Sequence, residues 1–348
     1  MKHLLLSLFV CGIFSASAQT GNSAFAFTQV PISVVSAALG GSQVATWRGD
    51  VNQISDNPAF IDSSLHQAVS LNYLNYLTTI NQASVAYSRM FDSLGFGSAY
   101  LRYFDYGTFQ EYDEFGNALG EFKVVDYEVG ISFGRKLNDN ITYGATFKNV
   151  FSSMYQNFAY GAAFDLGGFY QSNDGNFSGG LTIDNIGIEI VDYTGGERDF
   201  FPVSVNAAIS KKFDKAPIMF GLQYSNLQKW DLAGADGDIL SDPTIDPLTG
   251  EESRPTLTLD NLARHLSASV ALVPSENFNL MLGYNFRRRL ELATSERAGL
   301  VGFSFGANIK IKRFGIQYAI TNYHLSGTSN HFGITTNLNE WYSKKSLN

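Results

Sequence analysis

The sequence predicts an all-β protein: a closed antiparallel transmembrane β-barrel of about 14 strands, with an N-terminal segment plugging the lumen. Three observations support this fold. Apolar and polar side chains alternate in one segment after another, 16% of the residues are charged, and 14% are aromatic. A soluble domain normally carries about 25% charged residues, and no apolar run reaches the roughly 18 residues of a membrane helix. Strands with lipid on one face and a polar interior on the other account for this pattern.

Residues 1–18 are expected to form a cleaved secretory signal peptide. One lysine precedes an apolar run at 4–10, and a small-residue Ala-x-Ala site ends at Ala18. A lipoprotein leader is the alternative because Cys11 lies in this stretch, but Val10 is a poor residue before a lipidated cysteine. Cys11 is the one cysteine of the chain, so neither disulfides nor thiolate metal sites are expected after the leader.

Residues 19–61 are expected to form a plug or hatch inside the barrel. This stretch lacks the alternation of the later segments, and irregular backbone is tolerated at membrane depth only where protein surrounds it. Paired glycines permit a close approach of the backbone, and Asn-Pro is a turn signal. The residues predicted to form the plug motif are Ala37, Ala38, Leu39, Gly40, Gly41, Asn57, Pro58 and Ala59.

Residues 62–348 are expected to form the barrel itself. In the clearest strand, at 124–134, Val125, Tyr127 and Val129 alternate with polar or small residues, and a period of two places the two sets on opposite faces. An even number of strands lets an antiparallel sheet close without open edges. A soluble β-sandwich or solenoid is the alternative, but it would show more surface charge. The predicted strands are 68–78, 80–91, 95–106, 120–135, 140–152, 155–171, 176–188, 201–213, 216–228, 262–274, 276–291, 298–310, 313–325 and 330–339.

The connections between these strands fall into two sets. Those after even-numbered strands are short, as at 136–139 and 214–215, whereas long ones follow odd-numbered strands at 107–119, 189–200 and 229–261. Outer-membrane barrels combine short periplasmic turns with longer outer loops. The chain is therefore expected to be an integral barrel of the cell outer membrane, with the three long segments facing outward.

The N-terminal segment also carries a family resemblance. The leader, Phe25 and Phe27, the run at 34–41 and the Asn57-Pro58-Ala59 turn resemble the PorV and PorQ outer-membrane proteins of the type IX secretion system, which themselves resemble FadL-like transporters. The resemblance is sequence-specific over residues 20–61, and the length of 348 residues favours the PorQ branch. It implies a non-enzymatic member of the attachment complex that anchors a PorZ-like surface partner, together with PorU and PorV-like proteins.

Candidate chemical sites are few. Gly302-x-Ser304-x-Gly306 spells the nucleophile elbow of hydrolases, but it lies within an alternating strand rather than before a helix. The acidic loop at 231–246 lacks the D-x-D-x-D-G spacing of a calcium site. Neither a catalytic residue, a cofactor nor a metal is therefore expected. Three arginines are expected at the outer rim, and two interpretations are open for them: they contact lipopolysaccharide phosphates, or they snorkel toward water. These residues are Arg287, Arg288 and Arg289.

Two functions are compatible with these patterns. A third, an outer-membrane lipase, is disfavoured because Ser304 lies within a strand and because none of the histidines after the leader is spaced as H-x-x-x-H or paired with a nearby carboxylate. These histidines are His66, His265, His324 and His331. The first compatible function is a non-enzymatic anchor whose outer loops bind secretion-system proteins while the plug blocks the lumen. The alternative is a FadL-like channel for hydrophobic small molecules, which requires a lateral gap in the wall and an apolar lumen cavity. A net charge of -8 argues against nucleic acid as a partner.

Overall fold

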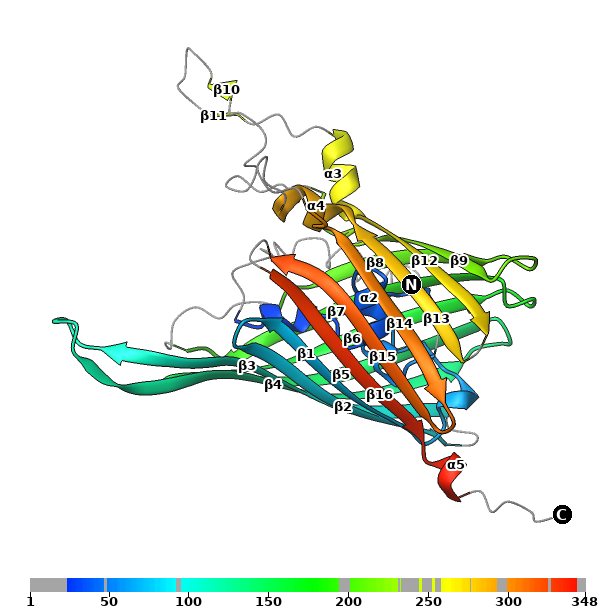
Figure 1. Ribbon diagram of the computed structural model, residues 1–348, viewed down its shortest axis with the longest axis horizontal. Coiled ribbons are helices and arrows are strands. Elements are labelled where there is room, and N and C mark those ends of the chain that lie inside the picture. Colours follow the sequence, from blue (N-terminus) through cyan, green and yellow to red (C-terminus); the bar gives the residue numbers. More distant parts are fainter. Residues whose placement is uncertain are drawn as a thin grey trace, which may run out of the picture.

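A computed structural model describes residues 24–46, 49–91, 95–193, 201–230, 232, 244–245, 252–253, 258–275, 277–292, 299–324 and 327–342. Fourteen of its strands pair into one closed antiparallel ring (Figure 1). Consecutive strands are neighbours around the ring, and the first strand closes it by pairing with the last, with Tyr73 opposite Phe332. The predicted fold class is therefore confirmed.

Each of the fourteen predicted strands corresponds to one strand of the ring. The ring strands are β1 (Ala68–Leu77), β2 (Ile80–Phe91), β3 (Gly95–Tyr112), β4 (Ala118–Lys136), β5 (Ile141–Met154), β6 (Asn157–Gln171), β7 (Phe177–Val191), β8 (Ser204–Lys212), β9 (Ile218–Tyr224), β12 (Leu266–Ser275), β13 (Phe278–Asn285), β14 (Phe303–Ile311), β15 (Phe314–His324) and β16 (Gly327–Asn337). A separate two-stranded sheet pairs β10 (Thr244–Ile245) with β11 (Glu252–Ser253). No helix among the described residues is long and apolar enough to cross a membrane.

The two faces of the ring differ in the way the alternation predicts. On β4, Ile131 is 60% exposed on the outer face, whereas its neighbour Ser132 is 3% exposed on the inner face. Leu, Ile, Val, Phe and Tyr side chains repeat this outward exposure around the ring, and Ser, Thr, Asn and charged residues line the inside. An apolar outer belt with a polar interior suits a barrel that stands in a bilayer.

The two ends of the barrel are built differently. At one end, called the base here, β4 and β5, β6 and β7, and β8 and β9 are joined by turns at 137–140, 172–176 and 213–217. The base also carries α5 (Asn339–Tyr342), which follows the last strand (Figure 1). The opposite end, called the mouth, carries the tip of the β3–β4 hairpin, α3 (Thr258–His265) and α4 (Phe286–Leu292).

The β3–β4 hairpin projects far beyond its neighbours at the mouth (Figure 1). The pairing of β3 with β2 ends at Asp105, and the pairing of β4 with β5 begins at Val124. Between these points β3 and β4 pair only with each other, from Thr108 opposite Lys123 to Tyr112 opposite Ala118. The predicted loop at 107–119 is therefore wrong: most of it is strand, and only residues 113–117 form the turn.

The two short helices at the mouth correct two predicted strands. The predicted strand 276–291 ends as β13 at Asn285, because residues 286–292 form α4. The predicted strand 262–274 begins only at Leu266, after α3. Each helix is stabilised by an i,i+4 ion pair, Arg287 with Glu291 in α4 and Arg264 with Asp260 in α3. Three consecutive arginines do not fit an alternating strand that faces lipid.

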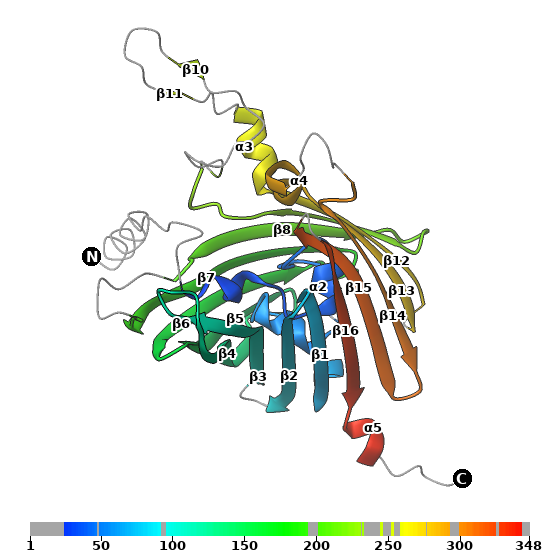
Figure 2. The same cartoon turned by 60° about the vertical axis from the view of Figure 1, so that its left-hand side comes forward.

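The N-terminal segment lies inside the ring (Figure 2). It consists of short helical turns joined by irregular backbone: η2 (Ala26–Gln29), α2 (Val34–Ala38), η3 (Val51–Ser55) and η4 (Ser63–Leu65). The hydrophobic core lies between this plug and the inner wall. In the largest cluster, Ile54, Phe60 and Ile61 of the plug pack with Phe96 and Phe169 of the wall.

Candidate functional site

All eight residues of the predicted plug motif are buried in the lumen. Ser33 caps α2 by accepting a hydrogen bond from the Ser36 backbone N–H. The helix ends at the glycine pair, where Gly40 has φ +99° and Gly41 has φ +140°, conformations that side-chain-bearing residues rarely adopt. The glycine pair thus lets the chain turn sharply back, and Asn285 of the wall donates to the Gly40 carbonyl oxygen at 3.0 Å.

The Asn57-Pro58-Ala59 turn is locked by its own asparagine side chain. The Asn57 Nδ2 group donates to the carbonyl oxygens of Val44, at 2.9 Å, and of Gly168 in the wall, at 3.2 Å. Its Oδ1 accepts from the Ala59 backbone N–H at 3.0 Å. One side chain therefore ties the turn both to the earlier part of the plug and to β6.

Glycines on the inner wall let the plug lie directly on the strand backbone. A Cβ atom at Gly134 would lie 2.7 Å from the Pro58 carbonyl oxygen, and one at Gly283 would lie 2.7 Å from the Gly40 Cα. Such distances are shorter than any real Cβ contact, so a side chain at these positions requires the plug to move. The wall glycines that face the plug in this way are Gly134, Gly144, Gly167, Gly180, Gly221, Gly283 and Gly306.

Polar side chains of the wall satisfy the irregular plug backbone. Asn72 of β1 donates to the Ile32 carbonyl at 2.8 Å, Thr142 of β5 to the Ala59 carbonyl at 2.6 Å, and Ser178 of β7 to the Ala45 carbonyl at 2.8 Å. A buried backbone carbonyl without a partner is costly, so these bonds stabilise the plug in one position. Because these hydrogen-bond donors come from strands spread around the ring, they hold the plug from several sides.

Two buried ion pairs line neighbouring strands of the inner wall. The Arg102 Nε atom on β3 lies 3.6 Å from the Glu128 Oε2 atom on β4, and the Lys148 Nζ atom on β5 lies 2.8 Å from the Asp165 Oδ2 atom on β6. The guanidinium of Arg102 also donates to the Phe27 carbonyl of the plug at 2.8 Å. A buried charge is tolerated only when it is paired and hydrogen-bonded, and each of these four groups is matched by an opposite charge.

A β-bulge in β7 turns two consecutive polar residues toward the lumen. The β6–β7 register shifts between Phe164 and Leu166, and Asn185 has φ +61°. Asn206 donates to Asp184 at 2.7 Å, and Asn185 accepts from the Lys148 Nζ atom at 2.6 Å. Strict alternation does not predict this bulge, although the sequence carries a signal of it: the outward apolar residues Ile183 and Ile186 of β7 are three positions apart, not two.

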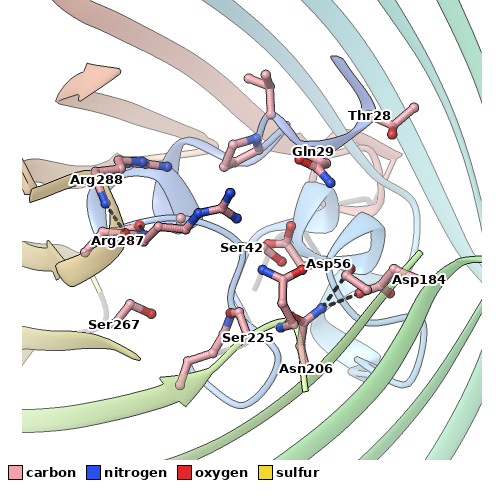
Figure 3. Close-up of a pocket in the computed structure, with 18 of the residues that line it drawn as sticks. Thr28, Gln29, Ser42, Asp56, Asp184, Asn206, Ser225, Ser267, Arg287 and Arg288 are labelled. Carbon is pink, nitrogen blue, oxygen red and sulfur yellow. Dashed lines mark hydrogen bonds between the residues drawn. The ribbon is translucent and has the colours of Figure 1, made fainter. Parts of the chain in front are cut away.

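A cavity of about 430 Å³ opens at the mouth, above the plug (Figure 3). Its lining is mainly polar and charged, with Asp56 and Ser42 from the plug and Asp184 and Asn206 from the wall on one side. Arg287 and Arg288 of α4 lie on the other side in this view. The mouth cavity is therefore not the apolar lumen cavity that a channel for hydrophobic molecules was expected to have.

The structure places the three predicted rim arginines in different surroundings. The Arg288 guanidinium lies 4.3 Å from the centre of the Tyr323 ring, over the lumen mouth. Arg287 pairs with Glu291 at 2.6 Å and also lines the cavity, whereas Arg289 donates to the Gly299 carbonyl at 3.3 Å. The contact with lipopolysaccharide stays a prediction for this group.

The other residues considered for chemistry, the possible nucleophile Ser304 and possible metal ligands, do not come together in a site among the described residues. Ser304 is fully buried on the inner face of β14, in regular pairing opposite Thr321. Ser304 and Gly306 of the G-x-S-x-G pattern therefore belong to a strand that begins just after Gly302. Within the described part of the chain, no group of three His, Cys, Asp or Glu side chains is arranged to hold a metal ion. Most of the acidic loop at 231–246 and the leader lie outside the described residues.

No family model and no curated protein sequence matches this chain. Solved structures are similar to it. Two structures of the toluene transporter TodX of Pseudomonas putida have TM-scores of 0.55 and 0.53 at 13% and 15% identity, and the alignments cover 89% and 88% of this chain and 99% and 96% of theirs. The toluene transporter TbuX of Ralstonia pickettii has a TM-score of 0.50 at 12% identity, with 89% of this chain and 98% of that chain covered.

At these identities the similarity concerns the fold alone. This similarity of fold agrees with the FadL-like barrel that the sequence resemblance implies, and the structure has the expected closed ring of fourteen strands. Nothing in the comparisons bears on the type IX secretion system.

Proposed function

We propose that this chain is a plugged outer-membrane barrel that docks a surface partner and does not conduct solutes through its lumen. The supporting observation is the fit of plug to wall: plug backbone lies on wall glycines, and wall side chains bond its carbonyl groups. Given the family resemblance, the proposed role is attachment of a PorZ-like partner in the type IX secretion system, together with PorU and PorV-like proteins.

The projecting β3–β4 hairpin is the proposed docking element. Phe109 and Phe122 stack with ring centres 5.6 Å apart, and Tyr155 packs edge-on to Phe122 at 5.2 Å. Beyond them, Tyr112 is 61% exposed and Phe115 is 89% exposed. Exposed aromatic side chains are typical anchors of protein interfaces. Residues 108–123 also hold four acidic residues and one basic residue, so this hairpin suits a partner surface that is apolar and basic.

Co-purification tests the docking role. In the shortened variant, Thr108 is joined to Lys123 through an Asn-Gly turn, which suits a two-residue hairpin. We expect the barrel to fold, as judged by heat-modifiable migration on a gel, and to lose its partner in pull-downs from outer membranes. Phe115→Ser should weaken capture, whereas Leu137→Ser, a change at an exposed residue of the base, should not. Full retention of all partners by the shortened variant would contradict the docking role of the hairpin.

Conductance tests the closed lumen independently. The purified barrel in a planar bilayer is expected to show no ion current, whereas deletion of residues 24–61 should open a conducting pore because the plug fills the lumen (Figure 2). Sustained current through the intact protein would rule out the plug as a permanent seal. This result leaves the pull-down outcome unaffected, so the two parts of the proposal fail separately.

A channel for hydrophobic small molecules is the second candidate, and the structural similarity to TodX and TbuX favours it. It would require the plug to move, because the ring of strands is closed and the mouth cavity is charged. Uptake of toluene by cells that express the chain tests it. Uptake above that of an empty-vector strain, abolished by a disulfide between plug and wall, would establish transport, and equal uptake would exclude it.

A further inference from the structure

We propose that the mouth cavity binds a small zwitterion, with its anionic group on Arg288 and its ammonium group on Asp184. This site is separate from the docking hairpin, and the inference does not depend on the proposed attachment role. It starts from the volume of the cavity. About 430 Å³ lies within the roughly 300–1,000 Å³ of small-molecule pockets, and both named residues line it (Figure 3).

Most charges around the cavity are already matched by an opposite charge. Among the described residues, Arg102 pairs with Glu128, Lys148 with Asp165, Arg264 with Asp260 and Arg287 with Glu291. These pairs leave no net charge for a ligand to neutralise. A ligand with a single charge has little to gain from them, because each group would have to leave its partner.

Arg288 of α4 and Asp184 of the wall are two exceptions, and Asp56 of the plug is a third. Arg288 stacks on Tyr323, but no carboxylate among the described residues forms an ion pair with it, and its buried Nη1 atom has no hydrogen-bond partner there. Asp184 Oδ2 accepts from Thr182 and Asn206, whereas the buried Oδ1 atom accepts from no described residue. Buried polar atoms are nearly always bonded, so an unbonded atom on each of two residues that line the same cavity indicates a missing partner.

Arg288 and Asp184 have opposite signs and come from different elements. Arg288 lies on α4 and Asp184 on the β7 bulge, with the floor of the plug between them (Figure 3). Asp56 of the plug, whose bonded neighbours Ser36 and Gln43 are uncharged, adds negative potential to the ammonium side. A molecule that joins an ammonium to a carboxylate or phosphate by a short linker satisfies both ends. Amino acids, short peptides and phosphoethanolamine head groups share this chemistry.

Titration calorimetry on the full-length protein in detergent tests the inference. The probes are glycylglycine and O-phosphoethanolamine as zwitterions, and acetate and ethylammonium as single charges. We expect saturable binding of at least one zwitterion, at least tenfold tighter than either single charge. Acetate or ethylammonium bound as tightly as the zwitterions, or no saturable binding of any probe, would overturn the proposal.

Variants assign the two ends of the ligand. Arg288→Gln and Asp184→Asn should each weaken binding at least tenfold, and Arg288→Lys should recover part of the loss. Lys310→Gln, which breaks an exposed ion pair with Glu340 far from the mouth, is the matched control. Heat-modifiable migration checks that each variant is folded. If Asp184→Asn fails to fold, Arg288→Gln alone decides the matter, because unchanged binding by that variant contradicts the site.

The two sources of the ligand can be separated in the same assay. If a lipid head group occupies the cavity, the affinity for glycylglycine should be lower in nanodiscs with phosphatidylethanolamine than in nanodiscs with phosphatidylglycerol. Equal binding in the two lipids identifies a soluble zwitterion instead. Both results support the assignment of the cavity and differ only in where the ligand comes from.

Discussion

Gly180 in the barrel wall lies against the carbonyl oxygen of Val44 in the plug, and the space between them does not admit a methyl group. On the same strand, Gly179 faces the other way, and a Cβ atom there would lie 3.8 Å from the Ala208 carbonyl oxygen. Adjacent glycines therefore play different roles: one gives the plug its position, and the other has ordinary space around it.

The first prediction compares these two glycines. Gly180→Ala should destabilise the plugged barrel by about 1–3 kcal/mol, the usual cost of overpacking, because the added methyl pushes the plug backbone off the wall. Gly179→Ala should be close to neutral. Urea unfolding in detergent measures the stability, and hydrogen exchange at residues 43–46 shows whether the plug has moved.

A second pair on β6 serves as an independent replicate. A side chain at Gly167 would overlap Asn57 and Pro58, whereas a Cβ atom at Gly168 meets nothing within 4 Å. Equal effects of Gly167→Ala and Gly168→Ala would show that strand propensity, and not contact with the plug, sets the cost.

The buried pair of Lys148 with Asp165 gives the second prediction. Lys148→Met removes the cation and leaves a buried carboxylate without its opposite charge, which should cost about 3–5 kcal/mol. The double variant Lys148→Met with Asp165→Leu should regain most of this loss, because neither charge remains. Denaturant unfolding in micelles measures both. Lys310→Gln, at an ion pair whose side chains are 46% and 38% exposed, should change stability by less than about 1 kcal/mol.

The turn of the β3–β4 hairpin gives the third prediction. Hydrogen bonds from the Asn117 side chain, then from backbone N–H groups, lower the pKa of Asp113 below its usual 3.8. A lowered pKa means that the carboxylate stabilises the turn above pH 3.8, and this stabilisation is lost as the pH falls through the lowered value. Asp113→Ala should therefore increase hydrogen exchange at residues 108–122 at neutral pH.

A titration checks the sign of this effect. The side-chain amide of Asn117, which bonds the Asp113 Oδ2 atom at 2.8 Å, should report a midpoint below pH 3.8 by nuclear magnetic resonance. A midpoint above that value would mean that the bonds in the turn do not favour the ionised form.

The rim arginines give the fourth prediction. Arg289 lies outside the set of residues that line the mouth cavity, whereas Arg288 points over the lumen onto Tyr323. If lipopolysaccharide phosphates bind at this rim, Arg289→Gln should lower the lipopolysaccharide that co-purifies with the barrel, and Arg288→Gln should leave it unchanged. A loss confined to Arg288→Gln would place the phosphate in the cavity instead.

Much of the barrel follows from side-chain alternation. A residue such as Ile131 needs lipid and its neighbour Ser132 needs the interior, so a period of two fixes both the strand and its faces. The plug was predictable because residues 19–61 break this rule at a depth where only surrounding protein allows it. Alternation does not show where a strand continues past the membrane, so the projecting part of β3 and β4 was predicted as a loop.

The details of the mouth depended on interactions that sequence patterns do not report. Strict alternation assigns Asp184 and Asn185 to opposite faces of β7, but both face inward because of a bulge. The role of Arg102 depends on Glu128 across the strand pair and on a plug carbonyl 75 residues earlier in the chain. Such partners become neighbours only after the ring closes.

The wall glycines have a reciprocal consequence for a barrel that lacks its insert. In a strand, glycine is less stable than alanine by roughly 0.5–1 kcal/mol when nothing needs the empty space. Once residues 24–61 are removed, alanine at Gly180 or Gly283 should therefore raise stability, the reverse of its effect in the intact chain. The barrel wall therefore carries glycines, at a cost in strand stability, at the positions where the N-terminal segment contacts its backbone. The positions of these glycines match the shape of that segment.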